Sequence, residues 1–185
     1  MTRALGDEPD SYLPDHGDRS YSVDRYDLDL DYRVEGNHLT GRASIALTTN
    51  ARVGAVSFDL ATLRVQKVTV NGRRPGRYVH RSGKLKVTLA SEVPAGTQLR
   101  VEVHYAGRPR PINGTWGVVG WEELTDGVIV AGEPNGAPSW FPCNDRPDDK
   151  APYTVTVTTD SAYHVVANGT LAERRVRASR TTWVH

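Results

Sequence analysis

The residues of this chain that could do chemistry gather in one short run, GEPNGAPSWFPCNDRPDDKAP, which spans residues 132–152. Glu133 follows the continuous apolar run 128–130, which predicts a strand buried on both faces. Pro134 then biases Glu133 toward an extended backbone. A carboxylate held at the end of a strand can serve as a fixed anion for a cationic group. The residue types alone favour an ordinary surface glutamate at this position.

Cys143 is the only cysteine, and a lone cysteine can be a nucleophile when the fold brings a histidine to it. It lies between Pro142 and Asn144, and no helix N-terminus precedes it to lower the pKa of its thiol. The sequence therefore favours a small buried hydrophobic residue over a catalytic thiol.

No metal site is expected within the chain, because the six histidines are scattered singly: His16, His38, His80, His104, His164 and His185. Asp27, Asp29 and Asp31 could suggest a calcium loop. Such a loop needs glycine at its sixth position and glutamate at its twelfth, where this chain has Tyr32 and His38. The solvated face of a strand explains the three aspartates better.

The elements that must position these residues are strands. Apolar and polar residues alternate with period two in six segments, 21–34, 41–49, 63–72, 84–89, 98–105 and 153–160, and two or three more strands are expected in 162–185. The phase changes near Gln66 and Lys67, which predicts a bulge. No window has helical period, so we predict an all-β domain over residues 21–185, either an antiparallel sandwich or an open curved sheet. A flexible surface arm at 1–20 precedes it.

Composition limits the function classes. The net charge is +1, no apolar run approaches the ~18 residues of a membrane span, and the first residues lack the apolar core of a secretory signal. These features predict a cytoplasmic chain without a nucleic-acid or membrane partner. The arginines Arg174, Arg175, Arg177 and Arg180 are interpreted as the charged protection of an edge strand. The final TTWVH stops within a strand pattern, which predicts that the polypeptide continues.

The run 132–152 resembles a signature in the N-terminal domain of zinc metallopeptidases of the aminopeptidase N type, the gluzincin family. The matching elements are Glu133-Pro134, Phe141-Pro142-Cys143, Asp145, Pro147 and Lys150-Ala151. The segments YDLDLDY, VTVNG and YHVVANGTL are similar to that domain too. Trp140 and the segment CNDRP resemble the actinobacterial branch of the family.

The resemblance implies a curved, saddle-like β domain, packed against a downstream catalytic domain that holds zinc through His-Glu-x-x-His and a distant glutamate. It implies that Glu133, together with a glutamate of a downstream Gly-x-Met-Glu-Asn motif, binds the α-ammonium of peptide substrates that have a free N-terminus. Trp140, Phe141, Pro142, Cys143, Asp145, Pro147 and Lys150 are then structural. This chain by itself should bind no zinc and hydrolyse nothing.

The sequence departs from the family pattern at three places. Ala137-Pro138 replaces an Ala-Arg pair, Ala131 replaces a glutamine found in several members, and Pro152 follows Lys-Ala. Two alternatives stay open at this point: a non-enzymatic β-sandwich binding module, and a catalytically dead relative of the family.

Overall fold

The computed structural model describes residues 13–114 and 117–185, which form three β-sheets. The strands are β1 (Tyr21–Arg33), β2 (His38–Thr49), β3 (Val53–Asp59), β4 (Arg64–Val70), β5 (Arg77–Arg81), β6 (Lys84–Val93), β7 (Gln98–Gly107), β8 (Ile112–Gly114), β9 (Gly117–Glu123), β10 (Val128–Ala131), β11 (Tyr153–Asp160), β12 (Glu173–Arg177) and β13 (Arg180–Val184). A 3-10 turn at Ala137–Ser139, η1, is the one helical element of the described residues.

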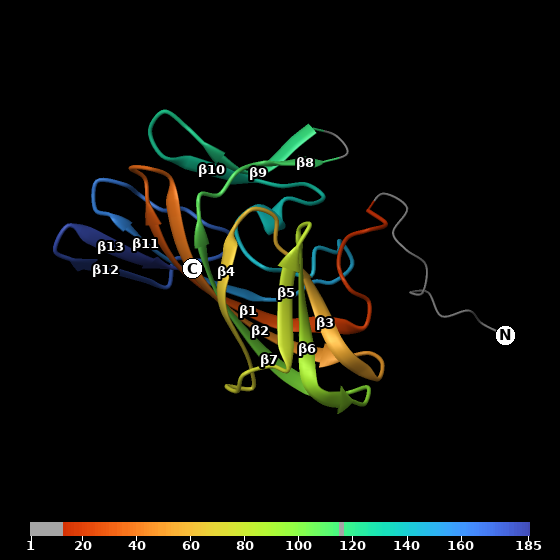
Figure 1. The fold of residues 1–185 in the computed structure, drawn as a ribbon. Helices are drawn as coiled ribbons and strands as arrows, with labels where there is room; N and C mark the ends of the chain where they lie inside the picture. Colours follow the sequence, from red (N-terminus) through yellow and green to blue (C-terminus); the bar gives the residue numbers. More distant parts are fainter. Residues whose placement is uncertain (1–12, 115–116) are drawn as a thin grey trace.

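The largest sheet has seven strands in the order β12-β13-β11-β1-β2-β7-β4, and it is strongly curved (Figure 1). Two three-stranded sheets accompany it, one ordered β3-β6-β5 and the other β10-β9-β8. In Figure 1 the sheet β3-β6-β5 stands in front of the central strands of the large sheet, and β8, β9 and β10 lie at the top. The all-β prediction is confirmed, with sheets that pack face to face as in a sandwich.

Strand pairing is antiparallel except between β1 and β11, which run parallel with Tyr26 beside Tyr153. The alternation of apolar and polar residues does not predict this parallel pair, because it shows which face of a strand is buried and not which strand lies next to it. The predicted bulge in β4 is confirmed, since its register against β7 shifts between Val65 and Lys67. The segment 162–185 contributes two strands, β12 and β13.

The core lies between the large sheet and the sheet β3-β6-β5. The inward residues of β7 alternate as predicted, with Val101, Val103 and Tyr105 fully buried. Tyr21 of β1 packs against Phe58 of β3, with 5.5 Å between their ring centroids. Burial of such large side chains supplies most of the free energy that holds the two sheets together.

The described part of the expected N-terminal arm, residues 13–20, is laid along the domain by hydrogen bonds. The Gly17 N–H donates to an Asp59 carboxylate oxygen at 2.8 Å, and the Ser57 N–H donates to Asp18 at 2.9 Å. Residues 1–12 lie outside the described residues, so the predicted boundary of the arm at residue 20 stays a prediction.

One sequence prediction is wrong. The strand β10 is not buried on both faces, because Ile129 and Val130 are 51% and 42% exposed. β10 is the edge strand of the sheet β10-β9-β8 and has β9 on one side. Its apolar side chains are left uncovered by the described residues. No helix in the described ranges is long and apolar enough to cross a membrane.

Candidate functional site

The loop that carries Glu133 is fixed by contacts between backbones. A Cβ added to Gly132 would lie 2.5 Å from the Asn135 carbonyl oxygen, and one added to Gly136 would lie 3.1 Å from the Gly120 N–H nitrogen. Gly120 itself has a φ of +98°, where an added Cβ would meet the Ser139 Oγ at 2.3 Å. Only glycine permits both this conformation and this approach.

Hydrogen bonds then hold the loop on β9. The Ser139 Oγ accepts from the Trp121 N–H at 3.0 Å and donates to the Gly136 carbonyl at 2.6 Å. Ser139 is fully buried, so these bonds are shielded from water. The backbone around Glu133 therefore has a defined position before any ligand arrives.

Glu133 and Pro134 are exposed, in contrast to the buried Asn135 and Gly136 that follow them. Its side chain makes no hydrogen bond or ion pair with the described residues, and the Glu133–Pro134 peptide bond is cis. Gly132 and Gly136 line a large groove, so Glu133 lies at the edge of that groove. A carboxylate without a partner, on a fixed backbone beside a groove, is free to bind a cation.

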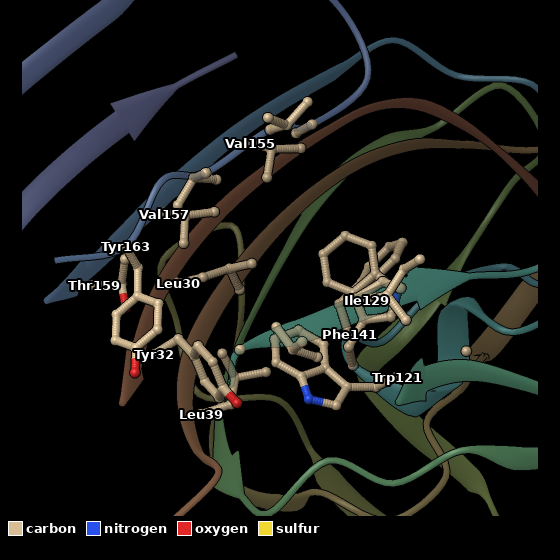
Figure 2. A pocket seen from close by; sticks show the side chains of 18 of the residues that line it. Leu30, Tyr32, Leu39, Trp121, Ile129, Phe141, Val155, Val157, Thr159 and Tyr163 are labelled. Atoms are coloured by element: carbon tan, nitrogen blue, oxygen red, sulfur yellow. The ribbon is translucent and has the colours of Figure 1, made fainter. Parts of the chain in front are cut away.

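The groove has a volume of about 870 Å³ and is mainly apolar. Figure 2 shows Val155, Val157 and Thr159 of β11 along one side, with Trp121 and Ile129 across from them. Leu30, Tyr32 and Leu39 line the region between these two sides. At one end Tyr163 meets Asp126 of the turn between β9 and β10, and the neighbouring carboxylate raises the pKa of the phenol. Two loops distant in sequence thus meet over the groove.

A buried asparagine organises the polar atoms beside the groove. The Asn37 Oδ1 accepts from the Tyr32 hydroxyl and from the Trp121 indole N–H, each at 3.2 Å. Its Nδ2 donates to the Pro109 carbonyl at 3.1 Å and to Glu123 at 3.0 Å. Every polar group of this side chain is satisfied, which fixes the orientation of Tyr32 and Trp121 in the wall of the groove.

The second half of the run 132–152 is a buried corner. Phe141 is 1% exposed and contacts Trp140 with 4.4 Å between ring centroids, and Tyr26 with 5.6 Å. Cys143 is 2% exposed and exchanges both backbone hydrogen bonds with Asp59. Burial raises the pKa of the Cys143 thiol, so the thiolate that a nucleophile requires is disfavoured. The prediction of a small buried hydrophobic residue at Cys143 is confirmed.

The corner also holds a small buried ionic network. Asp59 pairs with Lys84 on one carboxylate oxygen and accepts the Asp145 N–H on the other at 3.3 Å. Asp145 accepts a hydrogen bond of 2.7 Å from His16. Burial raises the pKa of Asp145, and the contact with His16 opposes this shift. The network ties residues 16–18 to the corner.

Two residues of the run that the resemblance marks as structural, Pro147 and Lys150, are exposed. The three departures from the family pattern are accommodated by backbone contacts. Pro138 is buried in η1 and its carbonyl accepts the Ala61 N–H at 2.8 Å. Ala131 ends β10 opposite Gly120, and the Pro152 carbonyl accepts the Tyr26 N–H at 3.0 Å.

The histidines do not converge. Within 13–114 and 117–185, no three His, Cys, Asp or Glu side chains are close enough together to hold a metal ion. His104 contacts Glu102 at 2.8 Å, and the ring of His164 lies 4.1 Å from Trp183. The aspartates of β1 lie on its outer face, where Asp27, Asp29 and Asp31 pair with Arg25, Arg42 and Arg180. No zinc ligand is assigned to these residues.

Comparison with solved structures shows which class of proteins has this fold. The crystal structure of an M1 zinc metallopeptidase from Deinococcus radiodurans is similar over 95% of this chain, with a TM-score of 0.88 and 31% identity. A variant of that enzyme bound to a Tyr-Ser-Ala substrate is similar over 98% of the chain, with a TM-score of 0.87 and 30% identity. The fold is therefore similar to that of the β domain in these M1 zinc metallopeptidases.

The family is shown by the model of the peptidase M1 N-terminal domain, which matches residues 22–185, and the chain belongs to this family. Tricorn protease-interacting factor F2 of Thermoplasma acidophilum is 24% identical over 159 residues, which cover 85% of this chain. The chain spans 41% and 42% of the two Deinococcus structures and 19% of the Thermoplasma protein.

The sequence singles out Glu133 as a candidate but does not predict the groove beside it. Tyr153, Val155 and Val157 alternate with threonines and read as a half-buried strand, although Tyr153 is 48% exposed. The one feature of the sequence that points to the groove is the apolar run of β10. Its residue types predict a buried strand, but its side chains are exposed beside the groove. Asn37 gave no signal, because a single asparagine before a strand is typical of an ordinary turn.

Proposed function

We propose that this chain is the substrate-cleft domain of a zinc-dependent aminopeptidase and that Glu133 binds the α-ammonium of the peptide. The observation that carries the proposal is the exposed, unpaired carboxylate of Glu133 on a backbone fixed by Gly120, Gly132 and Gly136. A carboxylate at a defined position attracts the charged N-terminus of a substrate and sets how far the peptide enters the site. Cleavage is then restricted to the first residue.

The zinc and the groups that act on the scissile bond are assigned to the catalytic domain downstream. When bound there, zinc would polarise the carbonyl and supply an activated water. The contribution of this chain is binding and orientation. The cytoplasmic location expected from the sequence stays a prediction.

The test uses the full-length protein and an amino-acid amide as substrate. Glu133→Ala should raise KM by about tenfold to a hundredfold, because a charge-assisted contact to the substrate is lost, while the zinc content stays unchanged. Glu122→Ala is the matched control, since Glu122 is another exposed glutamate on the neighbouring strand β9, and its KM should not change. An unchanged KM in Glu133→Ala contradicts the assignment.

The same assay separates the alternatives. A non-enzymatic β-sandwich module is disfavoured by the match of residues 22–185 to a peptidase family. A catalytically dead relative would show neither bound zinc nor hydrolysis in the wild-type protein, and that result would overturn the enzymatic proposal.

The groove is the surface that we assign to the downstream domain. Large apolar side chains around it are exposed, among them Ile129, Val130, Tyr153 and Val166, the last 84% exposed. Contiguous apolar surface of this kind is typical of an interface. Its position beside Glu133 would bring the carboxylate to the border between the two domains, where a substrate could bind.

Ile129→Arg tests this interface in the full-length protein. The substitution should lower the melting temperature, because it would place a charge between two packed surfaces. In the domain alone Ile129 is half exposed, so the same substitution would cost little there. Val176→Arg is the control, because Val176 is 58% exposed on β12 and does not line the groove. Equal and negligible effects of the two substitutions would contradict the interface.

A further inference from the structure

Charge is unevenly distributed along this nearly neutral chain. Residues 60–91 contain eight Lys and Arg and no Asp or Glu. The rest of the chain therefore contains 15 of the 23 basic residues and all 22 acidic residues. The eight are Arg64, Lys67, Arg73, Arg74, Arg77, Arg81, Lys84 and Lys86. Although the net charge of the chain is close to zero, the segment 60–91, which runs from before β4 into β6, is strongly basic.

Four of these cations share the outer face of the sheet β3-β6-β5. Leu85 and Val87 of β6 are fully buried, so the residues that alternate with them point away from the core. The register pairs Arg81 with Lys84, Val79 with Lys86 and Arg77 with Thr88. These six residues line a shallow depression of about 390 Å³, which we call the basic face.

The charges of the basic face are largely uncompensated. Lys84 pairs with Asp59, whereas Arg77, Arg81 and Lys86 make no ion pair with any described residue. Several cations elsewhere are paired, among them Arg25 with Asp27, Arg42 with Asp29, and Arg146 with Asp148. Like charges directly opposite each other on neighbouring strands, such as Arg81 and Lys84, destabilise a sheet. The stability of the fold does not explain this arrangement.

The basic face continues to an open strand edge. β5 pairs with β6 on one side and, among the described residues, makes no backbone hydrogen bond on the other. Charged side chains protect edge strands from aggregation, and this accounts for the arginines of β12. There Arg175 pairs with Glu173, and Arg174 lies over the ring of Trp183. Edge protection does not account for Lys84 and Lys86, because β6 is the central strand of its sheet.

We propose that the basic face and the free edge of β5 bind an extended acidic segment of another protein. An extended peptide can add to an open edge through its main chain. Its alternate side chains point to one face about 7 Å apart, close to the spacing of successive outward residues on β5 and β6. Carboxylates at alternate positions would thus meet Arg77, Lys86 and Arg81, with Val79 as an apolar contact between them.

The composition of the face favours a peptide over other polyanions. It has no aromatic side chain on which nucleic acid bases could stack, and no large apolar side chain that would enter a membrane. The proposal does not depend on Glu133, since the basic face lies on a different sheet from the loop that carries it.

The experiment measures fluorescence anisotropy of a peptide of four Glu-Thr repeats, with its N-terminus blocked by fluorescein, on the full-length protein. The block prevents binding through an α-ammonium. We expect salt-sensitive binding that is absent for four Gln-Thr repeats. The variant Arg77→Gln/Arg81→Gln/Lys86→Gln should bind about tenfold more weakly or worse, because three charge contacts are lost.

The matched control removes three charges from the other basic edge, by Arg174→Gln/Arg175→Gln/Arg177→Gln, and should change affinity less than about threefold. Equal losses in the two variants, or equal binding of the Glu and Gln peptides, would overturn the proposal. Tighter binding of phosphatidylserine vesicles or of single-stranded DNA through Arg77, Arg81 and Lys86 would overturn it too. If the triple variant melts early, Lys86→Gln alone should still weaken binding about threefold.

Discussion

The run 132–152 has two parts that differ in which atoms are packed, the backbone in the first and the side chains in the second. In residues 132–136 the backbone is packed and the carboxylate of Glu133 is left exposed. In residues 140–146 the side chains are packed, and Phe141, Cys143 and Asp145 are all buried. The run 132–152, which resembles the family signature, therefore contains two kinds of residue. Several residues build the corner, and one is available to a ligand.

Phe141→Ala should give the largest effect and tests the structural part. We expect a loss of about 3–5 kcal/mol in the free energy of unfolding, because a fully buried aromatic ring leaves a cavity. Urea denaturation followed by tryptophan fluorescence measures it, and Trp140 beside Phe141 reports on the site. Glu133→Ala should change the same free energy by less than about 0.5 kcal/mol. Comparable losses in both variants would abolish the distinction between the two parts.

Gly120→Ala tests whether backbone packing holds the loop of Glu133. Gly127 offers a close control, because both glycines have a φ of +98° but an added Cβ meets nothing within 4 Å at Gly127. Gly127→Ala should cost about 1 kcal/mol from backbone strain alone. Gly120→Ala should cost about 2–4 kcal/mol, since it adds a clash with Ser139. Thermal or urea unfolding of both variants gives the difference, and equal costs would contradict the packing.

The fold could be predicted from the sequence where one face of a strand is buried and the other is not. β7 is such a strand, and so is β4, whose change of phase predicted its bulge. The parallel partner of β1 could not be predicted, because β11 lies more than a hundred residues away and alternation carries no information on neighbours. β10 was misread because an apolar edge strand and a buried strand have the same residue types.

The candidate site was predictable only in part. The corner could be read from its aromatic and proline residues, which have few positions in a β domain other than a packed one. Glu133 could be singled out by resemblance, since its local physics also allows a plain surface residue. The glycine contacts that fix it depend on Gly120, which is distant in sequence, and no local pattern reveals that approach.

The most direct test of the central claim is the affinity of the full-length protein for two inhibitors, an amino-acid hydroxamate and its analogue without the α-amino group. In the wild-type protein we expect the amine to improve the inhibition constant by about tenfold or more. In Glu133→Gln that advantage should nearly vanish, while the affinity for the analogue without the amine stays the same. An advantage of the same size in both proteins would contradict the assignment of Glu133 to the α-ammonium.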